Sequence, residues 1–246
     1  MHADPLVSVV IPVKDEAANV TTLAREIRQA LDGVVPFEVI FVDDGSTDAT
    51  VNTLAALKNE FDGRLRVLRH LRNAGQSAAI TSGVRAARGL WIATLDGDGQ
   101  NDPADLPNLL ARVDLTRDPP ARVLVQGARL RREDDWLRRV FSRVANAVGG
   151  ALLQDQTPDS GCGIKVLPRA LYLELPYFDH MHRFMPALAL RAGATVQCVG
   201  VHHRPRGGGQ SKYGLNNRLW AGLVDLLGVM WLRRRARLDF QAREES

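Results

Sequence analysis

Two aspartates separated by one glycine follow a mostly apolar run of the sequence. The run covers residues 90–95, Asp96 and Asp98 come directly after it, and Gln100 lies two residues further on. Carboxylates this close repel each other, and a hard divalent cation with oxygen ligands removes that repulsion. A solvated turn is the simpler alternative. The favoured interpretation is a Mg²⁺ or Mn²⁺ site, formed by Asp96, Asp98 and Gln100, that links the protein to a diphosphate.

A second polar cluster, residues 43–48, follows a β-branched run. Its Asp and Ser residues favour turns and helix caps, which is one interpretation of the cluster. An aspartate at the end of a strand also accepts hydrogen bonds from a nucleobase N–H and a ribose hydroxyl. The two interpretations are compatible, so the cluster is a candidate nucleotide contact.

Three consecutive glycines, residues 207–209, lie between Arg204 and Arg206 on one side and Lys212 on the other. Arginine binds phosphate in a bidentate manner, lysine acts as a point charge, and glycine lets the backbone approach a ligand closely. A flexible loop without function is the alternative. The composition favours a lid that clamps an anion.

The elements that must position these residues alternate between strand and helix. Strands are expected at 7–11, 38–42, 65–69, 90–95, 122–126 and 195–201, and helices near 18–31, 49–59, 77–87, 106–113, 183–192 and 215–235. This order predicts an α/β fold with a mostly parallel, Rossmann-like sheet and helices on both faces. Ligands bind such sheets at the carboxyl ends of the strands, where the polar clusters stand. No repeat or linker divides the chain, so 1–246 is expected to be one domain.

The composition indicates the cellular compartment and argues against a zinc site. The chain has 2 cysteines, too few and too far apart for zinc or a disulfide framework, so both are expected to be packing residues in a reducing compartment. The histidines match no zinc spacing, and no zinc is expected. The N-terminus lacks a secretory pattern, and no run is long enough for a transmembrane helix, so a cytoplasmic location is expected.

The net charge of +4 comes partly from arginines in two amphipathic segments, residues 133–153 and 214–237. Valines and tryptophans recur at helical spacing beside these arginines, for example at Trp136 and Trp231. Core packing or dimerisation explains the pattern equally well, so a homo-oligomer stays possible. Tryptophan beside arginine also suits the surface of an anionic membrane. A nucleic-acid partner is not expected, because no known nucleic-acid-binding motif is present.

Six segments together resemble a known family. They are "VSVVIPVKDEAAN", "FVDDGSTDAT", "RNAGQSAAITSGVRAARG", "TLDGDGQNDP", "GCGIK" and "RPRGGGQSKYG". In order and spacing they resemble family 2 glycosyltransferases of GT-A fold (nucleotide-diphospho-sugar transferases), and more closely the polyprenyl-phosphate branch similar to dolichyl-phosphate mannose synthase. The resemblance covers roughly residues 6–232.

The resemblance implies a role for individual residues. Nucleotide contacts would come from Pro12, Lys14, Glu16, Val42, Asp44, Asp96 and Gly97, and the metal from Asp96, Asp98 and Gln100. The acceptor phosphate would be held by Arg129, Arg206, Ser211 and Lys212, and the residues acting in catalysis would be Asp98, Arg129, Arg206 and Lys212. Lys14-Asp15 stands where relatives have Tyr-Asn, and Lys165 stands where Gly-Phe-Arg is common.

The resemblance also implies the reaction. An inverting, metal-dependent enzyme would transfer one sugar from a nucleotide-sugar donor to a polyprenyl phosphate, such as undecaprenyl phosphate, for envelope or lipid A glycosylation. The chain would be a peripheral protein on the cytoplasmic face of the inner membrane. A transferase with a hydroxyl acceptor and a non-catalytic, membrane-docked nucleotide-sugar sensor remain the alternatives.

Overall fold

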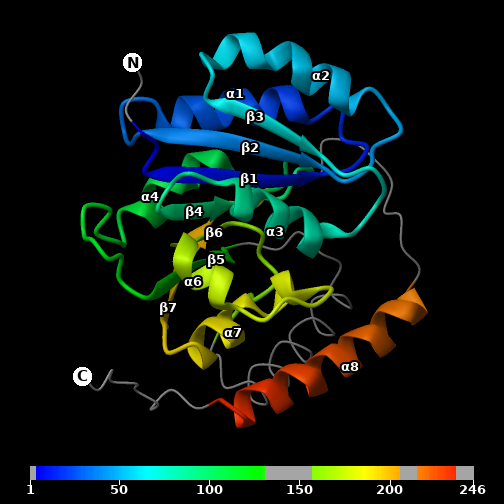
Figure 1. The fold of residues 1–246 in the computed structure, drawn as a ribbon, viewed down its shortest axis with the longest axis vertical. Helices are drawn as coiled ribbons and strands as arrows, with labels where there is room; N and C mark the ends of the chain where they lie inside the picture. Colours follow the sequence, from blue (N-terminus) through cyan, green and yellow to red (C-terminus); the bar gives the residue numbers. More distant parts are fainter. Residues whose placement is uncertain (1–3, 131–156, 206–214, 237–246) are drawn as a thin grey trace, which may run out of the picture.

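A computed structural model describes residues 4–130, 157–205 and 215–236. Its centre is a 7-stranded sheet in the order β3-β2-β1-β4-β6-β5-β7 (Figure 1). The strands are β1 (Val7–Val13), β2 (Phe37–Asp43), β3 (Leu65–Arg69), β4 (Trp91–Thr94), β5 (Val123–Arg129), β6 (Lys165–Pro168) and β7 (Thr195–Val201). All paired strands are parallel except for the pairs that β6 makes with β4 and β5. The mostly parallel sheet predicted from the sequence is confirmed.

The first face of the sheet packs against helices from the N-terminal half. These are α1 (Val20–Leu31), α2 (Thr50–Leu57), the short 3-10 helices η1 (Lys58–Phe61) and η2 (Pro103–Asp105), and α4 (Leu106–Leu110). Alternate residues of β1, including Val9 and Ile11, contribute to this core together with Leu23 and Ile27 of α1. Every residue of β1 and β2 is buried, because helices cover both sides of these central strands.

The second face packs against helices that follow β3, β6 and β7. These are α3 (Gln76–Ala86), α6 (Arg169–Glu174), the 3-10 helix η3 (Met181–Arg183), α7 (Met185–Arg191) and α8 (Leu215–Arg234). Val10 of β1 and Val42 of β2 point into this core, where they join Ala79 and Ile80 of α3. The close approach of α3 depends on Gly83, since an added Cβ there would lie 2.4 Å from Cγ1 of Val10.

Two described elements were not expected from the sequence. β6 has 4 residues and ends in Pro168, and α6 has 6 residues, so neither is long enough to produce a clear periodic pattern. Lys165 at the start of β6 is opposite Thr94 of β4 and Gln126 of β5. Because β6 is antiparallel, its first residue lies at the edge of the sheet where β4 and β5 end.

The helix α8 lies beside α7 at one end of the molecule (Figure 1). Val229 is fully buried against the second core, whereas Val224, Leu227 and Trp231 are exposed. The described part of the segment 214–237 is therefore apolar on its inner and on its outer side. The other amphipathic segment, 133–153, lies outside the described residues. Within the described ranges, no helix combines the length and the hydropathy that a membrane crossing requires.

The two cysteines differ in environment. Cys162 is buried, as expected for a packing residue, but Cys198 is exposed on β7. The packing role expected for Cys198 is therefore wrong. The reason is that β7 is the last strand in the order, so one of its sides has no neighbouring strand among the described residues.

Candidate functional site

The loop after β4 presents the two aspartates of the D-G-D sequence. The backbone N–H of Asp96 donates to Oδ1 of Asn101 at 3.0 Å, and the N–H of Gln100 donates to Oδ1 of Asp98 at 3.2 Å. Gly97 packs against the end of β1, since a Cβ there would lie 2.7 Å from the carbonyl oxygen of Pro12. Only glycine fits this contact. The loop is therefore fixed on both sides, and the acidic pair lies next to Pro12.

The carboxylate of Asp96 is enclosed by groups from three parts of the chain. Its Oδ1 accepts a hydrogen bond of 2.8 Å from Nε2 of Gln76. A Cβ on Gly163 would lie 2.2 Å from its Oδ2, so the absence of a side chain at Gly163 makes room for the carboxylate. Burial and the neighbouring charge of Asp98 raise the pKa of Asp96. Ionising Asp96 in this site therefore costs more free energy than it does in water, and a bound cation would offset that cost.

Two cations lie near this carboxylate, and both already have partners. Lys165 is 3% exposed, donates to the carbonyl oxygen of Cys162, and has a pKa that burial lowers. Arg129 forms a two-pronged ion pair with Asp159, with Nε–Oδ2 and Nη2–Oδ1 distances of 2.5 and 2.7 Å. Lys165 and Arg129 each lower the pKa of Asp96, although burial has the larger effect. The site therefore has positive charge next to its acidic pair.

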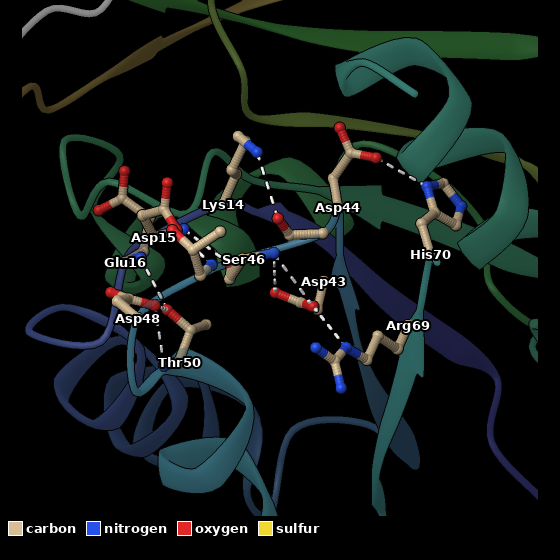
Figure 2. A network of polar contacts seen from close by, with 12 residues as sticks. Lys14, Asp15, Glu16, Asp43, Asp44, Ser46, Asp48, Thr50, Arg69 and His70 are labelled. Carbon is tan, nitrogen blue, oxygen red and sulfur yellow. Dashed lines mark hydrogen bonds and ion pairs between the residues drawn. The ribbon is translucent and has the colours of Figure 1, made fainter. Parts of the chain in front are cut away.

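The loops that follow β1 and β2 are joined by hydrogen bonds (Figure 2). Nζ of Lys14 donates to the carbonyl oxygen of Gly45 at 3.2 Å, the N–H of Glu16 donates to Oγ1 of Thr50 at 2.9 Å, and the N–H of Thr47 donates to Oδ1 of Asp15 at 2.7 Å. These bonds join the two loops that were predicted to contact a nucleotide. They fix the two loops relative to each other at the carboxyl ends of both strands.

The side chains of two predicted nucleotide contacts, Asp44 and Val42, contact other parts of the protein. Asp44 accepts hydrogen bonds of 2.8 Å from the N–H groups of Ala74 and Gly75, and its Oδ1 lies 2.8 Å from Nδ1 of His70. Figure 2 shows the contact with His70. Val42 is fully buried in the second core, so only its backbone can face a ligand. Asp44 fixes the loop that leads to α3, which the sequence did not indicate.

The chain that leads toward the glycine-rich segment is joined to the acidic loop. The N–H of Arg204 donates to the carbonyl oxygen of Gln100 at 2.9 Å, and Nε2 of His203 lies 3.5 Å from Nε2 of Gln100. The guanidinium of Arg204 binds Glu26 and Asp102 at 2.8 and 2.6 Å. Arg204 is therefore an anchor for this segment, which differs from the phosphate contact that its place beside the glycines suggested.

The predicted site residues fall into two groups. The structure brings Pro12, Lys14, Glu16, Val42, Asp44, Asp96, Gly97, Asp98, Gln100 and Arg129 to one edge of the sheet. Arg206, Ser211 and Lys212 lie outside the described residues. Sequence reasoning missed Gln76, Asp159 and Gly163. Gln76 and Gly163 stand inside quoted family segments, but neither residue type by itself indicated a contact with Asp96.

Comparison with protein-family models matches residues 8–175 to "Glycosyl transferase family 2". A curated relative, dodecaprenyl-phosphate galacturonate synthase of Rhizobium johnstonii, is 33% identical over 230 residues, which cover 92% of this chain and 67% of the relative. Another, undecaprenyl-phosphate 4-deoxy-4-formamido-L-arabinose transferase of Shewanella sediminis, is 33% identical over 225 residues, covering 91% of this chain and 66% of the relative. The chain thus spans about two thirds of the length of these relatives.

Among solved structures, glucosyl-3-phosphoglycerate synthase of Mycobacterium tuberculosis is similar in fold. Its complex with Mn²⁺, uridine diphosphate and glucosyl-3-phosphoglycerate superposes with a TM-score of 0.65 at 23% identity, over 93% of this chain and 80% of that one. The complex with Mn²⁺, uridine diphosphate and phosphoglyceric acid gives a TM-score of 0.66 at 22% identity, over 96% and 80%. At this level of identity the likeness concerns the fold.

Proposed function

Because this chain belongs to glycosyltransferase family 2, we propose that it transfers one sugar from a nucleotide-sugar donor to a polyprenyl phosphate, with inversion at the anomeric carbon. The observation that carries the proposal is the acidic pair, Asp96 and Asp98, at the carboxyl edge of a nucleotide-binding type of sheet, with the carboxylate of Asp96 held by Gln76 and Gly163. The names of the two curated relatives, both polyprenyl-phosphate sugar transferases, support the choice of acceptor.

The residues present fit a divalent cation. Asp96 and Asp98 supply carboxylate oxygens and Gln100 an amide oxygen, which are the ligand types that Mg²⁺ and Mn²⁺ prefer. Asp96 has a raised pKa because of burial and Asp98, so a cation would remove an unfavourable interaction that the protein alone leaves in place. Such ions take one or two carboxylates from the protein and complete their ligands with water and substrate phosphates. When bound, the ion would stabilise negative charge on the leaving diphosphate.

The reaction can proceed without a strong general base. A lipid phosphate is largely ionised above its second pKa of about 6, so its oxygen can attack the anomeric carbon directly. The new C–O bond forms as the bond to the nucleoside diphosphate breaks, and the electron pair leaves with the diphosphate oxygen. A single displacement of this kind inverts the anomeric centre. Arg129, Arg206, Ser211 and Lys212 are the residues proposed to hold the acceptor phosphate.

The acceptor is a lipid, and the chain has a surface that suits one. Val224, Leu227 and Trp231 form an exposed apolar side of α8, and the helix ends with Arg233 and Arg234. Apolar side chains next to arginines suit the interface of an anionic bilayer. This surface supports the proposal that the domain lies at the cytoplasmic face of the plasma membrane, with α8 against the lipid.

An extraction assay tests the reaction. Radiolabelled nucleotide sugars are incubated with Mn²⁺ and undecaprenyl phosphate, and label is counted in the organic phase. Asp98→Asn should lower kcat by about a hundredfold or more, because the variant keeps the shape of the side chain but loses its charge. Asp62→Asn is the matched control, since Asp62 is exposed and its positive φ of 50° is tolerated by asparagine. Label that enters only water-soluble products would contradict the lipid acceptor.

A further inference from the structure

Gln76 is the first residue of α3, and its side chain reaches across to the acidic pair. The Nε2 group donates to Oδ1 of Asp96 at 2.8 Å, although Gln76 itself is exposed. An exposed glutamine has several rotamers available, and fixing one costs conformational entropy. The bond is therefore specific only if the backbone at Gln76 is held firmly, and the contacts around it show that it is.

The residues just before Gln76 are fixed from the end of β2. The N–H groups of Ala74 and Gly75 both donate to the carboxylate of Asp44, which is buried. His70 connects the same carboxylate to α3, because its Nε2 lies 2.9 Å from Oγ of Ser82. A buried carboxylate that accepts several N–H groups holds a loop more firmly than a solvated turn does.

The residue just after Gln76 is fixed from the other side, by the turn at η3. Oγ of Ser77 lies 2.8 Å from Nδ1 of His182, and it also accepts a hydrogen bond of 3.3 Å from the N–H of His182. Ser77 is fully buried. The Ser77 hydroxyl is therefore hydrogen-bonded to both the ring and the backbone of His182 within a buried contact. Gln76 therefore stands between two residues that are held in place, so the backbone from which its side chain extends is fixed.

The other carboxylate oxygen of Asp96, Oδ2, lies against Gly163, in the space that a side chain at position 163 would occupy. Gln76 and Gly163 thus limit the carboxylate from two sides. The donor at Oδ1 is an uncharged amide, so it orients Asp96 without neutralising it. A lysine or arginine in the same place would also orient Asp96, but its charge would compete with that of a divalent ion.

We propose that Gln76 is a positioning residue, which holds Asp96 through a neutral hydrogen bond in the orientation that binds the divalent cation. The inference rests on the proposed function, since it assumes a cation at the acidic pair. It assigns Gln76 no contact with the reacting atoms. Loss of the amide should weaken cation binding, and a positive charge at position 76 should weaken it further.

Mn²⁺ binding to the purified chain tests this directly, because free Mn²⁺ is measured by electron paramagnetic resonance without donor or acceptor. Gln76→Ala should raise the Kd for Mn²⁺ about fivefold, as expected for the loss of one hydrogen bond to a charged group. Gln76→Lys should raise it by more than Gln76→Ala does. Gln197→Ala, which changes an exposed glutamine on β7, is the matched control and should leave the Kd unchanged.

The outcomes separate the two proposals. If the wild-type chain binds Mn²⁺ and both Gln76 variants bind it equally well while remaining folded, the positioning role is wrong and the proposed function stands. If the wild-type chain transfers sugar to the lipid at full rate with all divalent ions chelated, the cation itself is wrong, and the positioning role is overturned with it. In transfer assays the Gln76 variants should need more Mn²⁺ for half-maximal rate, and saturating Mn²⁺ should restore most of the rate of Gln76→Ala.

Discussion

At the scale of single residues, the half-buried carboxylate of Asp96 and the buried ammonium of Lys165 influence each other's pKa. Burial raises the pKa of Asp96 and lowers that of Lys165, and the charge of each partly offsets this effect on the other. The site holds its charges most easily when an additional cation balances Asp96 and Asp98 together. Gln76 donates to the carboxylate of Asp96 and Asn101 accepts from its backbone N–H, and both are uncharged.

His182 gives the site a measurable pH dependence of stability. Burial, together with the charges of Lys165 and Arg183, lowers its pKa to about 3, against an ordinary value of 6.5. Between these values the unfolded chain binds a proton that the folded chain does not. The free energy of unfolding should therefore fall as the pH drops below 6.5, by up to about 1.4 kcal/mol per pH unit. Urea unfolding between pH 5 and 7 measures this slope.

The matched variants for this prediction are His182→Gln and His202→Gln. The first should flatten the slope, since it removes the group that takes up the proton on unfolding. The second should not, because Asp105 raises the pKa of His202. A group of that kind stabilises the fold below its unfolded pKa and loses the effect as the pH rises, which is the opposite sign. An unchanged slope in His182→Gln would show that other groups cause it.

At the scale of elements, two glycines inside helices should respond in opposite ways to alanine. In Gly83→Ala on α3 the new methyl group would lie 2.4 Å from Val10 of β1, so α3 or β1 must shift. In Gly228→Ala on α8 the methyl group would meet nothing within 4 Å. We expect Gly83→Ala to lower the free energy of unfolding by about 1–3 kcal/mol. We expect Gly228→Ala to raise it by up to about 1 kcal/mol, through helix propensity alone.

Thermal unfolding of both variants checks the pair. Gly228→Ala is the control for Gly83→Ala, because the chemical change is identical and only the surroundings differ. A Gly83→Ala protein with an unchanged Tm would mean that α3 can move away from β1 at no cost. That result would contradict the close packing that holds Gln76 near Asp96.

The sequence predicted most elements correctly where strands were apolar and helices were long. All six expected strands and the helices between them correspond to elements of the 7-stranded fold. β6 was missed because its 4 residues carry no periodic signal. In the site, the rule that ligands bind at the carboxyl ends of strands correctly grouped Pro12, Asp44 and Asp96. It could not reveal the pairing of Arg129 with Asp159 or the contact of Gln76, since these depend on three-dimensional distances between remote segments.

At the scale of the whole molecule, the outer side of α8 distinguishes one end of the protein from the rest. Replacing Leu227 and Trp231 by glutamate should abolish co-flotation with vesicles that contain anionic lipid, because the change removes apolar contacts and adds repulsion. Val34→Glu is the control, since Val34 is also an exposed apolar residue but lies in the turn between α1 and β2. Flotation of the double variant at the wild-type level would contradict the assignment of α8 to the lipid surface.

The reversed direction of β6 has a further consequence for how the fold can vary. The segment 157–164 reaches the binding edge through the beginning of a strand, whereas the other strands reach it through their ends. The side-chain amide of Gln126 donates to the carbonyl oxygens of Asp159 and Cys162, so the middle of the segment is held to β5. The segment 157–164 should therefore be exchangeable. A chimera that receives it from a relative would have different residues next to Asp96 and would keep the same strand order.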